Sequence, residues 1–171
     1  MLFSRMVAGS FMEFGSDSVI ELPVTIHGES RIAIGSNVYI GPGSWLFTRG
    51  EEALLEIGDG TRMSGMCVVS AVSRVRLGRS VLLGRNVYIA DNNHGSSDAS
   101  VPIADQELEK IAPVTIEDGA WLGQNTVILS GVTVGAGAVV GANSVVLEDV
   151  PPRAVAVGAP AKVVRWLDRS P

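Results

Sequence analysis

The sequence predicts an all-β fold, a parallel β-helix of about six triangular coils with one long inserted loop and a short C-terminal tail. Three observations predict it: apolar side chains recur every six residues, small residues stand at a fixed place after them, and 20 of the 171 residues are glycine. A helical face would repeat every three or four residues, and a hairpin strand every two. A six-residue unit instead fits a short strand followed by a corner.

The repeat consists of six triplets of apolar anchors spaced six residues apart: Phe14, Ile20, Ile26; Ile34, Ile40, Leu46; Ile57, Met63, Val69; Leu77, Leu83, Ile89; Ile116, Leu122, Ile128; and Val134, Val140, Val146. Sixteen of the eighteen positions four residues after an anchor hold Ser, Thr, Ala, Val or Cys, which suits a tight corner. Glycine follows nine anchors, and we expect it to tolerate the backbone bend there. Three units then make one coil, and the coils stack as parallel strands.

A single domain accounts for the whole chain. The composition, 46% hydrophobic and 18% charged, supports a globular core over residues 1–171. Within it we expect coils at about 14–151, the inserted loop at about 90–115 and the tail at 152–171. The interruptions of the repeat at 32–33 and 75–76 are interpreted as trivial insertions, and residues 52–56 as a small corner loop.

Composition and charge exclude several classes of function. A net charge of -5 leaves no broad basic surface, so nucleic acid is not an expected partner. The chain has one cysteine, Cys67, which excludes a disulfide framework and a thiolate zinc cluster, and no metal site is expected. The position of Cys67 at a corner of the repeat predicts a packed side chain. The uncharged stretch 119–146 keeps the glycine-rich six-residue repeat, which argues against a membrane span. The first residues lack the apolar run of a signal peptide, so we expect a cytoplasmic protein.

The largest break in the repeat points to the functional site. Residues 95–115 add twenty-one residues to the coil, and a loop of that length in a solenoid is typical of a lid, a substrate wall or a subunit contact. His94 stands at its base and could act as a general base, with Asp91 and Asn93 nearby to orient it. The residues alone leave open the alternative of an exposed loop histidine. We expect no chemical role for His27, the other histidine.

The C-terminal part of the sequence carries a family resemblance. IEDGAWLGQNTVILSGVTVGAGAVVGANSVVLEDVPPRAVAVGAPAKVVR resembles the closing coils and tail of the sugar, maltose and xenobiotic O-acetyltransferases, a branch of the hexapeptide-repeat acyltransferases. The resemblance covers about residues 14–165. It implies a left-handed β-helix, acetyl-CoA as the acyl donor and a homotrimer. It also implies a catalytic histidine in an Asn-His element at the root of the loop, which corresponds here to Asn93 and His94.

The same resemblance implies a cofactor-binding set: Trp121, Gly123, Gly141, Ala142, Lys162 and Arg165. The Trp of this motif lines the acyl and pantetheine end of the coenzyme A site, and the two cations match positions that reach the coenzyme A phosphates. Taken without the family, these residues could equally be an interface tryptophan and ordinary surface cations. The chain departs from the pattern at Leu147 and Glu148, where relatives often carry a basic residue, and its first thirteen residues are too short for the sugar-binding helical segment of some relatives.

These observations favour an acetyl-CoA-dependent O-acetyltransferase. The expected acceptor is a small molecule with a sugar or sugar-like hydroxyl, and His94 would act as the base for direct transfer, since no convincing nucleophile for an acyl-enzyme is present. A sugar N-acetyltransferase of the same fold and a non-catalytic interaction scaffold remain as alternatives. The zinc carbonic anhydrases that share this β-helix need three histidine ligands, and the chain has two. Outward valines such as Val127, Val139 and Val145 favour a trimer that covers them.

Overall fold

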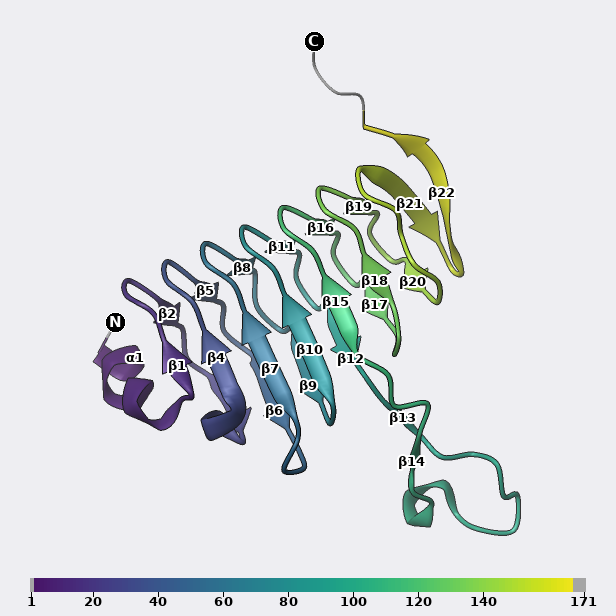
Figure 1. Ribbon diagram of the computed structural model, residues 1–171, viewed down its shortest axis with the longest axis horizontal. Helices are drawn as coiled ribbons and strands as arrows, with labels where there is room; N and C mark the ends of the chain where they lie inside the picture. The colour runs from purple at the N-terminus through teal and green to yellow at the C-terminus, as the bar shows by residue number, and fades with distance from the viewer. Residues whose placement is uncertain (1, 168–171) are drawn as a thin grey trace.

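The computed structural model describes residues 2–167, which form a three-sided prism of stacked coils (Figure 1). Each coil contributes one strand to each of three sheets, here named faces A, B and C, and neighbouring strands within a face are parallel except at the C-terminal hairpin. The predicted fold class, a left-handed parallel β-helix, is confirmed. Six coils are complete, and one further strand on face B begins a seventh.

The strands of the three faces are short. Face A contains β1 (Glu13–Phe14), β4 (Ile32–Ile34), β7 (Leu54–Ile57), β10 (Arg74–Leu77), β15 (Val114–Ile116) and β18 (Thr133–Val134). Face B contains β2 (Val19–Ile20), β5 (Tyr39–Ile40), β8 (Arg62–Met63), β11 (Leu82–Leu83), β16 (Trp121–Leu122), β19 (Val139–Val140), β21 (Ala154–Gly158) and β22 (Ala161–Trp166). Face C contains β3 (Val24–His27), β6 (Ser44–Thr48), β9 (Val68–Ala71), β12 (Tyr88–Ala90), β17 (Val127–Ile128) and β20 (Val145–Val146).

The predicted anchors fill the interior of the prism. On face B the stack pairs Ile20 with Ile40, then Met63, Leu83, Leu122 and Val140, so that each anchor sits directly above the one in the coil before it. All of these side chains are buried. Only two anchors of the first coil, Phe14 and Ile26, are partly exposed, because no coil covers them on the N-terminal side.

Face A is wider than the repeat predicts. Its strands carry a second inward side chain two residues before the anchor, and these side chains are fully buried: Ile32, Leu55, Val75 and Val114. The interpretation of 32–33 and 75–76 as trivial insertions was therefore wrong, because these residues belong to β4 and β10. Most of the segment 52–56 is likewise part of β7, and the inserted loop ends before β15.

The glycines that follow the anchors do not make the bend, which corrects the role predicted for them. A Cβ atom on Gly84 would lie 2.6 Å from the backbone nitrogen of Gln124 in the next coil, so these positions are glycine because two coils approach closely there. The bend instead uses a left-handed residue three places after the anchor. Asn86, Asn125 and Asn143 have φ of 58° or 59° at one such corner, a conformation that asparagine tolerates better than most residues.

The two ends of the prism are closed differently. At the N-terminal end α1 (Leu2–Val7) and the 3-10 helix η1 (Ala8–Ser10) lie across the first coil, where the Ser4 hydroxyl accepts a hydrogen bond of 2.9 Å from the N–H of Ile20. At the other end β22 folds back antiparallel on β21 (Figure 1). Two further 3-10 helices are η2 (Glu29–Arg31) and η3 (Ile103–Asp105). Within residues 2–167 no helix has the length and apolar character needed to cross a membrane.

Candidate active site

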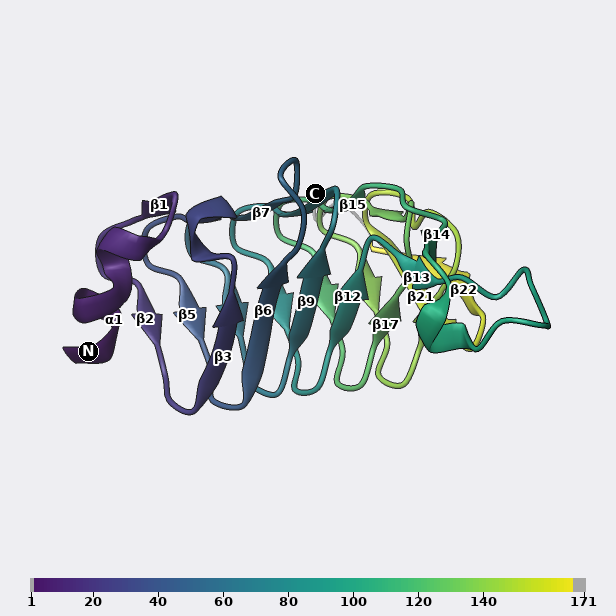
Figure 2. The ribbon, with the colours of Figure 1, turned by 90° about the horizontal axis from the view of Figure 1, so that it is seen from below.

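The inserted loop forms an arm that projects from the corner between faces C and A (Figures 1 and 2). Its base is a two-stranded antiparallel ribbon of β13 (Asn93–His94) and β14 (Leu108–Glu109), in which His94 pairs with Leu108. Farther out, the Gln106 amide donates hydrogen bonds of 2.8 Å to the carbonyls of Asp98 and Val101. These bonds give the arm a defined shape, and the exposed His94 stands at its root.

Asp91 fastens the arm to the prism. Its carboxylate is fully buried and accepts hydrogen bonds from the N–H groups of Val72 (2.9 and 3.2 Å) and Ser73 (2.7 Å) in the coil below, and from the amide of Asn92 (3.0 Å). Its carbonyl accepts a bond from the N–H of Ala112, where the chain returns from the arm. Both ends of the insertion are thus tied to one carboxylate residue. No hydrogen bond joins Asp91 to the His94 ring within residues 2–167.

A cavity of about 370 Å³ opens beside His94 on face C. Its walls come from the arm root and from three coils: Phe47, Arg49, Ser70, Val72, Tyr88, Asn92, Asn93, His94 and Leu108. Two of the predicted catalytic residues, Asn93 and His94, therefore line one cavity, whereas Asp91 lies beneath it. The cavity combines aromatic and aliphatic side chains with polar groups from Arg49, Ser70, Asn92, Asn93 and His94, and such groups can orient a small molecule.

A second hollow, about 540 Å³, lies on the arm side of His94. It shares Arg49, Val72, His94 and Leu108 with the first cavity, and its other walls are Gly50, Ala104, Asp105, Gln106, Glu107 and Ile111. The imidazole of His94 therefore stands between two concave surfaces. One is lined mainly by the coils and holds no carboxylate, and the other carries the acidic side chains of the arm.

The residues predicted to bind the cofactor lie elsewhere on the prism. Trp121 is on face B and is 48% exposed, so it does not share a face with His94. Gly123, Gly141 and Ala142 lie at the corner between faces B and C. A Cβ atom on Gly123 would come within 2.5 Å of the Ala142 nitrogen, which shows how tightly the two coils stack there. Next to them, the side-chain amides of Asn86, Asn125 and Asn143 form a hydrogen-bonded ladder. This corner is rigid, and it separates the tryptophan from the histidine.

The two predicted tail cations are exposed on β22 at the C-terminal end of face B. Lys162 forms an ion pair of 3.1 Å with Glu148, one of the two residues at which the sequence departs from the family pattern. Both side chains are well exposed, 63% and 76%, so the pair is a weak one. The carboxylate nevertheless occupies one direction from which an anion could approach Lys162.

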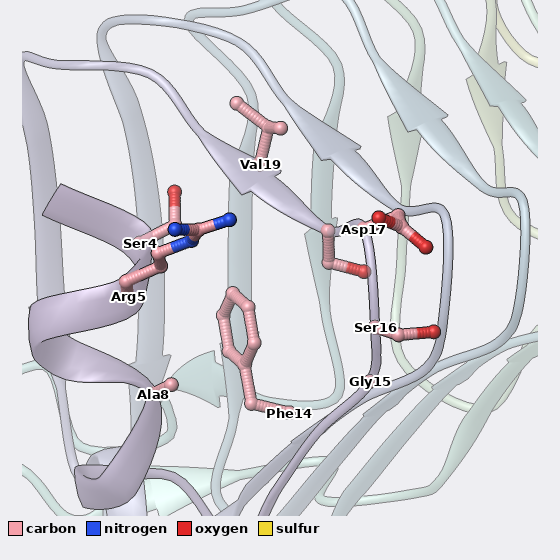
Figure 3. A pocket seen from close by; sticks show the side chains of 9 residues that line it. Ser4, Arg5, Ala8, Phe14, Gly15, Ser16, Asp17 and Val19 are labelled. Carbon is pink, nitrogen blue, oxygen red and sulfur yellow. The ribbon is translucent and has the colours of Figure 1, made fainter. Parts of the chain in front are cut away.

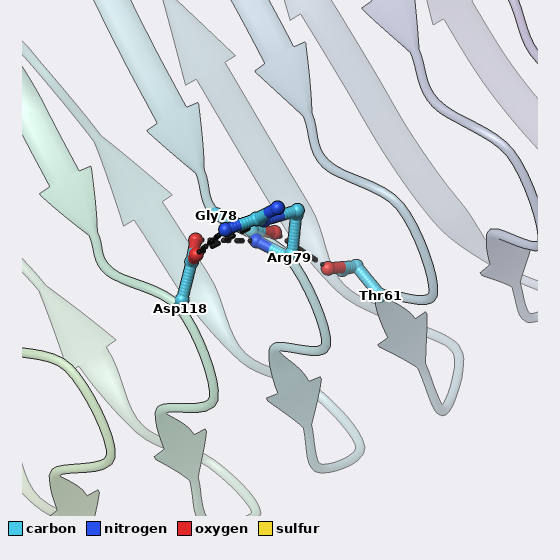
Figure 4. A network of polar contacts seen from close by, with 4 residues as sticks. All are labelled: Thr61, Gly78, Arg79 and Asp118. Atoms are coloured by element: carbon cyan, nitrogen blue, oxygen red, sulfur yellow. Dashed lines mark hydrogen bonds and ion pairs between the residues drawn. The ribbon is translucent and has the colours of Figure 1, made fainter.

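Two other features of the prism lie apart from His94. A hollow of about 350 Å³ between α1 and the first coil is lined by Ser4, Arg5 and Phe14, among others, and lies at the end of the prism away from the arm (Figure 3). At the corner between faces A and B, the carboxylate of Asp118 accepts bonds from the N–H and the guanidinium of Arg79 (Figure 4). Hydrogen bonds from the backbone N–H of Arg79, and to a lesser extent from its guanidinium, hold the pKa of Asp118 below its ordinary value.

The cysteine is packed, as predicted. Cys67 is buried, and burial raises the pKa of its thiol.

Comparison with known proteins identifies the family. The model for bacterial transferase hexapeptide (six repeats) matches residues 113–148. The lipopolysaccharide biosynthesis O-acetyl transferase WbbJ of Escherichia coli is 32% identical over 153 residues, which cover 86% of this chain and 78% of WbbJ. The chain belongs to the hexapeptide-repeat acyltransferases.

Two further relatives agree with this acyltransferase assignment. The acetyltransferase Rv3034c of Mycobacterium tuberculosis is 37% identical over 145 residues, or 83% of this chain, and the chain spans about half of its length (47%). The hexapeptide-repeat acetyltransferase VCA0836 of Vibrio cholerae was crystallised with acetyl coenzyme A. It superimposes with a TM-score of 0.71 at 30% identity, covering 96% of this chain and 76% of VCA0836.

Sequence reasoning missed most of the lining of the cavity beside His94, including Phe47, Arg49 and Tyr88. The repeat held a signal for Phe47, because the anchors Leu46, Val69 and Ile89 stack on face C and the residues that directly follow them share one edge. It held none for Arg49, which follows its anchor by three residues, whereas His94 follows its own by five. No group of three or more metal-ligating side chains occurs in the part of the chain that the structure describes.

The attachment of the arm through Asp91 gives a first prediction. Asp91→Ala leaves the N–H groups of Val72 and Ser73 without their acceptor in a water-poor corner. We expect a loss of about 2 to 4 kcal/mol in the free energy of unfolding and faster protease cleavage within residues 95–111. Denaturant unfolding and limited proteolysis measure the two effects, with Asp91→Asn as the milder variant and the exposed Asp98→Ala as control. Wild-type unfolding and cleavage of Asp91→Ala would contradict this role.

Proposed function

We propose that this chain transfers an acetyl group from acetyl-CoA to a hydroxyl of a sugar or sugar-like acceptor, with His94 as the general base. The observation that carries the proposal is the position of His94: an exposed imidazole held at the root of a built arm, on the wall of a cavity of small-molecule size. Two findings about relatives support it. WbbJ is named an O-acetyl transferase of lipopolysaccharide biosynthesis, and VCA0836 binds acetyl coenzyme A.

The proposed reaction is a direct transfer. The imidazole of His94 takes the proton of the acceptor hydroxyl, whose oxygen attacks the thioester carbonyl carbon. The carbon–sulfur bond then breaks, and the coenzyme A thiolate leaves and takes up the proton from the imidazolium. Asn93 lines the same cavity and would orient the acceptor or the ring. The buried Asp91 contributes by positioning the arm on which His94 stands.

The corner between faces B and C offers donors for the tetrahedral oxyanion. The N–H groups of Gly123 and Gly141 donate to the next coil, to Val140 and Ala156, at 2.8 Å each. Among residues 2–167, by contrast, the N–H groups of Gln124 and Ala142 make no hydrogen bond. We therefore assign the oxyanion role to these two amides, since a donor must be free to bind developing charge.

A homotrimer would complete this site. Within the described chain, every exposed large apolar side chain on the coil strands lies on face B or C: Trp45, Leu82, Tyr88, Trp121, Val157, Val163, Val164 and Trp166. The outward side chains of face A are mostly polar, including Glu56, Arg76 and Thr115. Placing face B of one subunit toward face C of the next closes a ring and covers the apolar faces. The groove between them would bring Trp121 of one chain to His94 of its neighbour.

The base role of His94 predicts a specific kinetic loss. His94→Ala should lower kcat by about 10² to 10⁴, the usual contribution of a positioned base, while the affinity for coenzyme A stays near wild type. Release of free coenzyme A in the presence of a panel of sugar acceptors measures the rate, with matched amino sugars to distinguish O-transfer from N-transfer. His27→Ala, on the other histidine, is the control. A His94→Ala enzyme within a factor of two of wild type would refute the mechanism.

The tail cations predict an effect confined to the donor. Changing both Lys162 and Arg165 to Ala should weaken acetyl-CoA binding by about 1 to 3 kcal/mol, the contribution of charge-assisted phosphate contacts, with little change in acceptor KM. Glu148→Gln should act in the opposite direction by up to about 1 kcal/mol, because it removes the carboxylate that competes for Lys162. Calorimetry checks both, with Arg76→Ala on face A as control. Unchanged affinity in the double variant would remove both cations from the site.

The shared groove predicts both a mass and a complementation result. Light scattering should give about three times the chain mass of 17.9 kDa. Co-expression of His94→Ala and Trp121→Ala chains, with isolation of mixed trimers through two tags, should restore part of the activity that each variant alone lacks. Activity returns because some grooves combine an intact histidine with an intact tryptophan. A fully active monomer, or mixed trimers with no recovery, would defeat this arrangement.

A further inference from the structure

Arg49 is the charged side chain that the cavity beside His94 presents to a ligand. The other walls of that cavity are aromatic, aliphatic or uncharged polar groups, apart from the imidazole itself. Arg49 also lines the hollow on the arm side of His94, so it stands at the junction of the two concave surfaces. The chain as a whole carries a net charge of -5, which makes a cation at this place a local exception.

The backbone of Arg49 is held by hydrogen bonds, whereas its side chain has no partner among residues 2–167. Thr48, buried at the end of β6, donates a hydrogen bond of 2.8 Å to the carbonyl of Gly28, and the N–H of Arg49 donates one of 3.0 Å to the carbonyl of Ala71. Among residues 2–167, by contrast, the guanidinium of Arg49 has no hydrogen bond and no ion pair, although Glu51 and Glu52 follow closely. All five of its N–H donors are available to a ligand.

The aromatic residues near Arg49 could pack against a sugar ring. Phe47 and Tyr88 line the same cavity, and Phe47 is stacked on His27 with 4.9 Å between ring centroids and 26° between ring planes. The apolar C–H face of a pyranose can pack against such rings, as other apolar surfaces do. A sugar in this position would have its edge between Arg49 and His94.

The acidic side chains of the arm decide which of the two concave surfaces an anion enters. Asp105 and Glu107 line the hollow on the arm side, where they repel negative charge. No carboxylate lines the cavity on the coil side, whose one permanent charge is the guanidinium. An acceptor with a negative group is therefore directed to the coil side, where a planar guanidinium can bind a carboxylate or phosphate with two parallel hydrogen bonds.

We propose that Arg49 selects an acidic acceptor: a sugar whose carboxylate or phosphate binds the Arg49 guanidinium, whose ring packs on Phe47 and Tyr88, and whose hydroxyl faces His94. This inference rests on the proposed function of the site and adds the substrate class. Both anionic groups present the same chemistry to the guanidinium, so matched acceptors are needed to separate them.

The kinetic test compares charged and neutral acceptors in one assay of coenzyme A release. The pairs are methyl glucuronide with methyl glucoside, and glucose 6-phosphate with glucose. Wild type should prefer the anionic member of at least one pair by tenfold or more in kcat/KM. Arg49→Gln should reduce that preference at least tenfold, mainly through KM, and Arg49→Lys should retain part of it. Arg76→Gln, which removes the same charge from face A, should keep the wild-type ratio. An equal ratio in wild type and Arg49→Gln would overturn the assignment.

A binding measurement tests the anion site independently of the proposed acetyl transfer. Calorimetric titration of the same sugars without acetyl-CoA should show tighter binding of the anionic member to wild type and to His94→Ala, and a loss of that difference in Arg49→Gln. If no acceptor releases coenzyme A but the difference in binding is present, the proposed reaction fails and the anion site stands. If charged and neutral members bind alike, the anion site is refuted, whatever the enzyme turns over.

Discussion

The backbone ladder between coils is the constraint on which the rest of the structure depends. Every strand of a coil must pair with the strand before and after it, so stacked coils share one register around the prism. A residue can be added only where the chain turns, because an insertion within a strand would break the pairing on both sides. The arm obeys this rule: it leaves the prism after Ala90 at a corner and returns before Val114. Function is added at corners because the ladder leaves no other place.

The same ladder explains why the candidate site gathers residues far apart in the sequence. Phe47, Ser70 and Ala90 occupy equivalent positions in three consecutive coils of face C, so the edge of that face collects one residue from each turn. Arg49 and His94 come to one cavity in this way, although forty-five positions separate them. Asp91 connects the arm to the neighbouring coil. Its carboxylate accepts a hydrogen bond from the coil below, and its carbonyl accepts one from the chain where it returns from the arm. These bonds attach the root of the arm, where His94 stands, to the coils.

The sequence was sufficient for the interior of the prism and insufficient for its corners. Anchors such as Ile40 and Leu83 could be placed because burial on the inside of a coil demands an apolar side chain at a fixed spacing. The role of the glycines after the anchors was predicted wrongly. Gly84 lies close to Gln124 of the next coil, and a contact between coils cannot be recognised from the sequence of one coil. Arg49 was missed for a related reason. An exposed arginine looks the same in the sequence whether or not an arm is folded beside it.

The separation of His94 and Trp121 is the most informative feature of the site. They lie on different faces of one prism, with the tightly stacked corner at Gly123 and Ala142 between them, and no rearrangement of a rigid solenoid could bring them together within one chain. If both take part in one reaction, they must come from two subunits. The apolar character of faces B and C gives those subunits a reason to associate, and the polar face A leaves the outside of the ring in water. In this arrangement association and catalysis depend on the same two faces. The outward polar side chains of face A take no part in either.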